Sequence, residues 1–177
     1  MSTQTIHPKE LEFTNYQTYL WSMFFVGVSV LAPAVFHAFG VAGQVFLPIY
    51  FLVLLSSLMF GWRVGLAVAV FSPLANFSFL AMPALPILPY VIFKGTVLAL
   101  IILLVEKIKI NKFVGLILAL LVYQLIGFLV IMVFAHNFKL ASMDLMAGYP
   151  GLLAQLVLVI LFSVKFYEQQ DNGGNLK

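Results

Sequence analysis

Lys94 is the residue whose position most needs a chemical explanation, because its charged side chain lies inside the apolar stretch 89–105. A lysine at the centre of a membrane-spanning helix costs roughly 2.5 to 3.5 kcal/mol on insertion scales. Two explanations are open. The side chain can extend past the start of its helix to water, or its ammonium group can line a binding cavity and pair with a ligand carboxylate. Tyr90 lies four residues earlier on the same helical face and would add a hydroxyl group.

Ser72 and Asn76 form a second polar pair, four residues apart in the apolar stretch 64–81. The amide of Asn76 offers both a donor and an acceptor, so it could recognise an amide or a ring nitrogen of a ligand. The alternative is a structural one, in which Asn76 makes a hydrogen bond to a neighbouring helix.

Other candidates are polar or aromatic residues near the ends of apolar stretches. His37 closes the first stretch and either caps a helix or lines a pocket. Tyr50 and Phe79 could stack on a flat ring, although aromatic residues also gather at membrane interfaces. Gln124 and Gln155 lie within apolar stretches, where an amide is expected to bond to another helix.

Several kinds of chemistry are excluded or disfavoured. The chain has no cysteine, which excludes disulfides, thiolate metal sites and cysteine nucleophiles. His136 and Asp144 are expected in a loop, too isolated to form a metal site. We expect no enzyme and no cofactor, because no acidic residue falls within a predicted span and neither an HExxH motif nor a phosphate-binding loop is present.

The composition indicates an all-α integral membrane protein. Hydrophobic residues make up 63% of the chain and charged residues only 8%, and the mean hydropathy is +1.10. The N-terminal segment lacks the features of a signal peptide, so the first span is expected to be retained. We expect a polar segment at 1–18, a transmembrane domain at 19–167 and a tail at 168–177. The six predicted helices are 19–38, 45–60, 64–81, 89–105, 113–135 and 149–166.

The basic residues predict the orientation. With both termini in the cytoplasm, only Lys139 lies in an outer loop and only Lys94 within a span, whereas the other basic residues lie inside. Topology therefore explains the net charge of +3, and nucleic-acid binding is not expected. The outer loops, around 40–44, 81–88 and 136–149, carry most of the polar variety, which favours a ligand that arrives from outside.

Part of the sequence resembles the S-components, the substrate-binding membrane subunits of energy-coupling factor vitamin transporters. The likeness extends from Leu31 to Glu106, and the six predicted spans also fit. The motifs that carry it are Val35-Phe36-His37, Phe46-Leu47-Pro48-Ile49-Tyr50, Phe60-Gly61-Trp62-Arg63-Val64-Gly65-Leu66, Phe71-Ser72-Pro73-Leu74, and Met82-Pro83 with Pro86.

This resemblance implies a subunit in the cell membrane of a prokaryote that captures a water-soluble vitamin or vitamin precursor at its outer face. It also implies two sets of partners, a transmembrane coupling subunit and two cytoplasmic ATPase subunits. The family's docking notch in the first helix corresponds here to Met23 and Gly27. Substrate-binding residues would be Lys94, Asn76, Tyr50, His37, Tyr90, Ser72 and Phe79.

A second class of function stays open. Small multi-span proteins of this size also include structural scaffolds of the cell-shape and wall-synthesis type, which need no ligand. Such a protein would associate with wall-synthesis proteins instead of a coupling subunit, so its partners on purification would distinguish the two classes.

Overall fold

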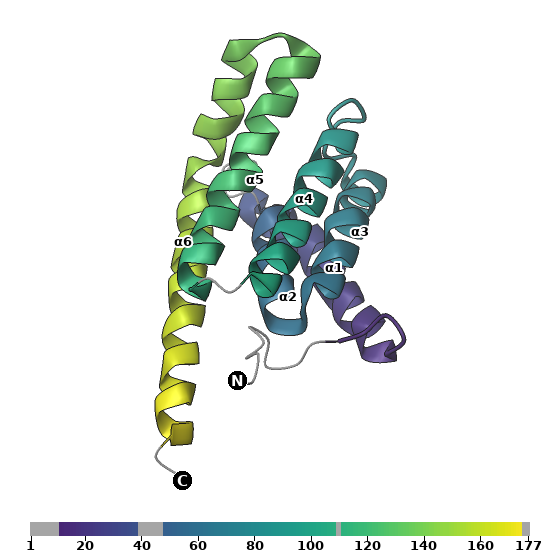
Figure 1. The fold of residues 1–177 in the computed structure, drawn as a ribbon. Helices are drawn as coiled ribbons and strands as arrows, with labels where there is room; N and C mark the ends of the chain where they lie inside the picture. Colours follow the sequence, from purple (N-terminus) through teal and green to yellow (C-terminus); the bar gives the residue numbers. More distant parts are fainter. Residues whose placement is uncertain (1–10, 39–47, 109–110, 175–177) are drawn as a thin grey trace.

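The computed structural model describes residues 11–38, 48–108 and 111–174, and within these ranges every regular element is an α-helix (Figure 1). This confirms the all-α prediction. The helices are α1 Tyr16–Ala38, α2 Pro48–Phe60, α3 Trp62–Leu80, α4 Leu88–Lys107, α5 Lys112–Ala135 and α6 Phe138–Gly174.

Three of the helices have an asparagine N-cap immediately before their first residue. The Oδ1 atoms of Asn15, Asn111 and Asn137 each accept a hydrogen bond of 3.0 Å from a backbone N–H in the first turn that follows. Such a bond satisfies one of the donors that a helix start leaves unpaired. These caps place the start of α1 at Tyr16 and that of α6 at Phe138, earlier than the predicted 19 and 149.

The start of α6 is the larger correction. The sequence predicts a sixth helix that begins at 149, next to Pro150, but Pro150 lies inside α6. Proline lacks a backbone N–H and bends a helix that continues through it. The segments Phe138–Met146 and Gly148–Leu161 are accordingly bent by 45°. Asp144 is therefore a helical residue and not a loop residue, and it belongs to the pair of segments that would form one bent span if both cross together.

The helices are long and apolar enough for a multi-pass membrane protein. Trp62–Leu80, Leu88–Val105 and Phe113–Phe134 each meet the length and hydropathy expected of a span, with mean hydropathies of 1.5, 2.3 and 2.8. The bent α6 adds a fourth span if its two segments cross together, and Ile49–Phe60 is a shorter apolar helix. Large apolar side chains on the outside of the bundle, such as Leu121 and Leu161, suit contact with lipid.

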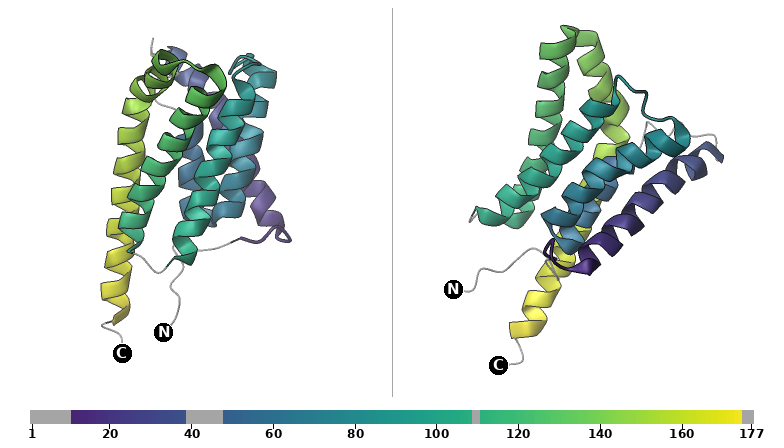
Figure 2. Two further views of the ribbon diagram at one scale, coloured as in Figure 1. Left: turned by 45° about the horizontal axis from the view of Figure 1, so that its top comes forward. Right: turned by 90° about the vertical axis from the view of Figure 1, so that its right-hand side faces the viewer.

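α2 is the central helix of the described part of the chain. Its backbone packs closely against α1, α3, α4 and α6, whereas the backbone of α1 approaches only α2 and α3, and that of α5 only α4 and α6. The views in Figure 2 show the α5–α6 pair on one side of the bundle and α1 on the other. The side chains of Val53, Leu54 and Leu58 on α2 are fully buried in the core between them.

Small residues allow α2, α3 and α4 to approach closely. A Cβ atom added at Gly65 would lie 2.9 Å from Cβ of Ser57 and 3.3 Å from its Cα, so α3 could not stay at its present distance from α2. At the next interface, a Cβ atom at Gly95 would lie 3.2 Å from Cβ of Ala69. Contacts between small residues are a usual way to bring transmembrane helices together.

Gly65→Ala is expected to lower the thermal stability of the protein. Overpacking against Ser57 costs about 1–3 kcal/mol, more than the roughly 1 kcal/mol that alanine gains over glycine in a helix. Thermal unfolding in detergent micelles, followed by tryptophan fluorescence, measures the change in Tm. Gly27→Ala is the matched control, because no neighbouring atom lies within 4 Å of its added methyl group. Equal Tm values for the two variants would contradict the close α2–α3 contact.

Candidate functional site

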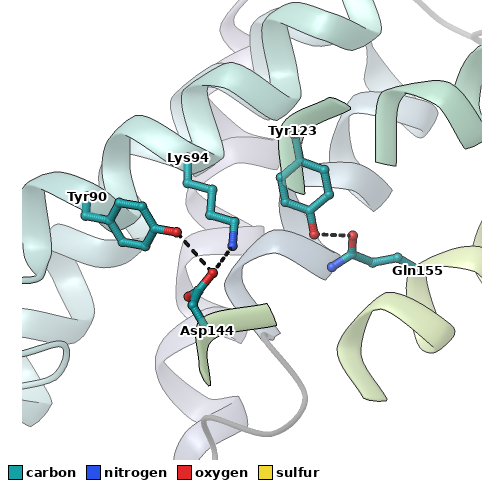
Figure 3. Close-up of polar contacts among 5 residues, drawn as sticks. All are labelled: Tyr90, Lys94, Tyr123, Asp144 and Gln155. Carbon is teal, nitrogen blue, oxygen red and sulfur yellow. Dashed lines mark hydrogen bonds and ion pairs between the residues drawn. The ribbon is translucent and has the colours of Figure 1, made fainter. Parts of the chain in front are cut away.

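An ion pair joins α4 to α6. Nζ of Lys94 lies 2.8 Å from Oδ2 of Asp144, and the hydroxyl group of Tyr90 donates to the same oxygen at 3.1 Å (Figure 3). Tyr90 and Lys94 are one helical turn apart on α4, so both reach the same carboxylate. Three side chains from two helices thus form one charge-assisted hydrogen-bonded cluster.

The two charges of this pair are buried to different extents. The side chain of Lys94 is 0% exposed, whereas that of Asp144 is 25% exposed. Lys94 lies six residues beyond Leu88, so it is about 9 Å along the axis from the start of α4. Lys94 therefore does not extend past the helix start to water, the first explanation that the sequence left open. Its ammonium group is enclosed by the bundle and neutralised from within the chain.

Three tyrosine rings surround the ammonium group. Nζ of Lys94 is 5.4 Å from the ring centroid of Tyr50, 5.6 Å from that of Tyr90 and 5.7 Å from that of Tyr123. Distances below about 6 Å are those at which the face of an aromatic ring attracts a cation. The rings come from α2, α4 and α5, so together with Asp144 on α6 four helices converge on Lys94.

A second polar contact links α5 to α6 beside this cluster. The buried hydroxyl group of Tyr123 donates to Oε1 of Gln155 at 2.9 Å. This is the interhelical role that the sequence suggested for Gln155. In the described part of the chain, Nε2 of Gln155 and both amide atoms of Gln124 are buried without a hydrogen-bond partner. Buried polar groups without a partner are costly, so this region has unused capacity for hydrogen bonding.

Gly127 makes room for the cluster on α5. A Cβ atom at this position would lie 2.9 Å from Cε of Lys94 and 2.9 Å from the hydroxyl oxygen of Tyr90. Any larger residue would push these side chains away from Asp144 or push α5 away from α4. Sequence reasoning missed both Gly127 and Asp144. The capping residue Asn137 was the available signal for Asp144, because it predicts a helix that continues through position 144.

The structure places Ser72 and Asn76 at a different interface. Nδ2 of Asn76 donates to Oγ of Ser29 on α1 at 3.1 Å and to the backbone oxygen of Ser72 at 2.8 Å. α1 has no contact with α4, α5 or α6 in the described ranges. Tyr50, Tyr90 and Lys94 are therefore brought together, while Ser72 and Asn76 lie between α1 and α3. Oγ of Ser72 and Oδ1 of Asn76 are buried there without a described partner.

Phe79, Met23 and Gly27 lie outside the cluster. Phe79 is 76% exposed near the end of α3, and Met23 is 76% exposed on α1. Gly27 is also on the exposed side of α1. The side chain of His37 falls outside the described residues. Among the described residues, no group of three histidine, aspartate or glutamate side chains is placed to hold a metal ion.

Comparisons with known proteins add no relative. No protein-family model, no curated protein and no solved structure matches the chain.

Asp144→Ala is expected to destabilise the protein more than Lys94→Met. Removing one partner of a buried ion pair costs about 3–5 kcal/mol, because the other charge stays behind unpaired. Asp144→Ala leaves the wholly buried Lys94 unpaired, so it should incur the full cost. Lys94→Met leaves only the partly exposed Asp144 unpaired, so its cost should be smaller. Thermal unfolding of the purified variants in detergent micelles compares the two losses.

The double variant Lys94→Met/Asp144→Ala is the control for this comparison. Because it removes both charges, it should regain much of the stability that Asp144→Ala loses. A double variant as unstable as Asp144→Ala, or a larger loss for Lys94→Met, would show that the unpaired ammonium group is not the source of the instability.

Proposed function

We propose that this chain is the solute-binding membrane subunit of a transporter of the energy-coupling factor type. Its cargo would be a water-soluble vitamin or vitamin precursor. The observation that carries the proposal is the cluster that the buried Lys94 forms with the partly buried Asp144 and Tyr90 inside an otherwise apolar helical bundle. The resemblance of residues 31–106 to the S-components supports the same function.

A buried ion pair is better explained by function than by stability. Hydrophobic residues of similar volume often replace such a pair with no loss of stability, or with a gain of about 1–4 kcal/mol. Ionisable side chains within membrane-spanning segments generally mark the paths or sites of solutes and ions. Here the pair is ringed by three tyrosines, which provide both aromatic faces and hydroxyl groups for an organic solute.

The proposed topology has six spans with both termini in the cytoplasm of a prokaryotic cell. The cluster would then lie in the outer half of the bundle, because α4 and α6 would both begin at the outer face. A solute arriving from outside would meet the cluster after passing the start of these helices. Lacking a phosphate-binding loop, the chain would depend on a coupling subunit and two ATPases for energy.

A structural scaffold is the alternative function, and the same cluster disfavours it. A scaffold needs apolar surfaces for its partners but has no use for a lysine and a carboxylate within its core. An enzymatic role is also less well supported, since Lys94 and Asp144 bind each other and neither is held ready as a free base.

The topology can be tested by cysteine labelling, because the natural chain has no cysteine. In intact cells, a membrane-impermeant maleimide is expected to label Ala84→Cys and Lys139→Cys. Lys107→Cys should react only after the membrane is permeabilised. The three positions lie at exposed sites near helix ends. A cysteine that fails to react there is therefore on the inner side of the membrane, not buried in the protein. Labelling with the opposite pattern would reverse the proposed orientation.

Solute binding can be tested with the purified protein in nanodiscs. We expect one member of a panel of water-soluble vitamins and their precursors to raise Tm and to bind with one-to-one stoichiometry in calorimetry, without ATP. Lys94→Met is expected to abolish binding, and Leu121→Ala, whose side chain is 63% exposed on α5, should leave it unchanged. A panel without any binder, together with co-purification of wall-synthesis proteins, would favour the scaffold.

A further inference from the structure

We infer that Asp144 is an exchangeable counter-ion, which a solute carboxylate replaces on Lys94 and Tyr90. This inference rests on the proposed function, and it names the solute class as small carboxylates joined to a flat or aromatic body. In the absence of solute, the chain supplies the missing carboxylate itself and thereby occupies its own binding site.

The unequal burial of the two partners determines which of them can leave. Lys94 is 0% exposed, so leaving its ammonium group without an anion beside it is costly. Asp144 is 25% exposed, so its carboxylate is the partner that has room to move away once another anion has taken its place. A cationic solute that captured Asp144 would leave Lys94 buried and unpaired. An anion can therefore enter this site at lower cost than a cation.

The arrangement of donors fits one incoming carboxylate oxygen. Lys94 and Tyr90 both direct their donors to Oδ2 of Asp144, at 2.8 Å and 3.1 Å. A solute oxygen at the position of Oδ2 would receive both hydrogen bonds, so no donor would be lost in the exchange. The rings of Tyr50 and Tyr123, which flank the ammonium group, provide apolar faces for the body of the solute.

The segment that carries Asp144 buries few side chains, and its Phe138 ring packs edge-on against Phe128 with the ring centroids 6.0 Å apart. Asp144 belongs to Phe138–Met146, the short arm of α6 that is bent by 45° from Gly148–Leu161. Ala141 is buried in this arm, but Phe138, Met143 and Met146 are 66%, 55% and 74% exposed. A segment with few buried contacts moves at low cost. The Asp144 carboxylate can thus withdraw without disturbing the core around α2.

The test uses 4-fluorobenzoate, an aromatic carboxylate, followed by fluorine NMR with the full-length protein in nanodiscs. Asp144→Asn keeps the shape of the side chain but removes the competing charge. If Asp144 occupies Lys94 in about nine-tenths of wild-type molecules, Asp144→Asn should bind the probe about tenfold more tightly than wild type. Lys94→Met, alone or combined with Asp144→Asn, should not bind it.

The matched cation 4-fluorobenzylamine is the control for charge and should bind neither wild type nor Asp144→Asn. Equal affinity of 4-fluorobenzoate for wild type and Asp144→Asn, binding that survives Lys94→Met, or preferred binding of the cation would each overturn the inference. Asp144→Ser is the second variant if Asp144→Asn does not fold. If both variants unfold on purification, they are prepared with 4-fluorobenzoate present throughout, and failure to recover folded protein then also counts against the inference.

This experiment can fail independently of the proposed function. A vitamin that binds wild type, together with no gain of probe affinity in Asp144→Asn, would leave the function standing and remove the exchange. Tighter probe binding by Asp144→Asn, together with a vitamin panel that gives no binder, would support the exchange and count against a vitamin carrier.

Discussion

A charge inside an apolar bundle must be neutralised, and the structure around Lys94 follows from that constraint. Lys94 is wholly buried, so a carboxylate has to reach it from another helix, and Asp144 on α6 does so. The pair ties α6 to α4, and the tyrosines of α2 and α5 close around it. The mutual position of four helices is thus coupled to one ion pair. The cost of desolvating its charges is offset only when the geometry and the hydrogen bonding of the pair are good.

Small residues bring the helices close enough for this pairing to occur. Gly127 lets Lys94 and Tyr90 lie against α5, and Gly65 and Gly95 let α3 lie close to α2 and α4. In lipid there is little hydrophobic drive between helices, so close packing and hydrogen bonds have to supply the association. The glycines and the polar cluster therefore act together. Close approach lets the side chains of Lys94 and Tyr90 reach Asp144, and these contacts link α4 to α6, which otherwise packs against α5 and α2.

The sequence predicted the helical architecture and two of the three side chains of this cluster. Lys94 and Tyr90 could be found because one is a charge in an apolar stretch and the other lies one turn away. Asp144 was missed because Pro150 resembles a helix start, whereas the capping bond from Leu140 to Asn137 starts α6 earlier. Gly127 could not be found, since its importance depends on which atoms of another helix face it. Pairing between helices is a tertiary property, which local patterns do not contain.

The direction of the helices favours an anion at this end of the bundle. α2, α4 and α6 are alternate helices that run the same way in Figure 1, and Tyr50 lies in the first turn of α2 while Lys94 and Asp144 lie in the second turns of α4 and α6. Each helix N-terminus carries a partial positive charge, which favours anions by about 0.3–1 kcal/mol in the first turn and by less further along. This field stabilises the carboxylate of Asp144 and destabilises the ammonium group of Lys94. The field therefore adds to the need of the buried ammonium group for a counter-ion, and a carboxylate from solution would gain from both.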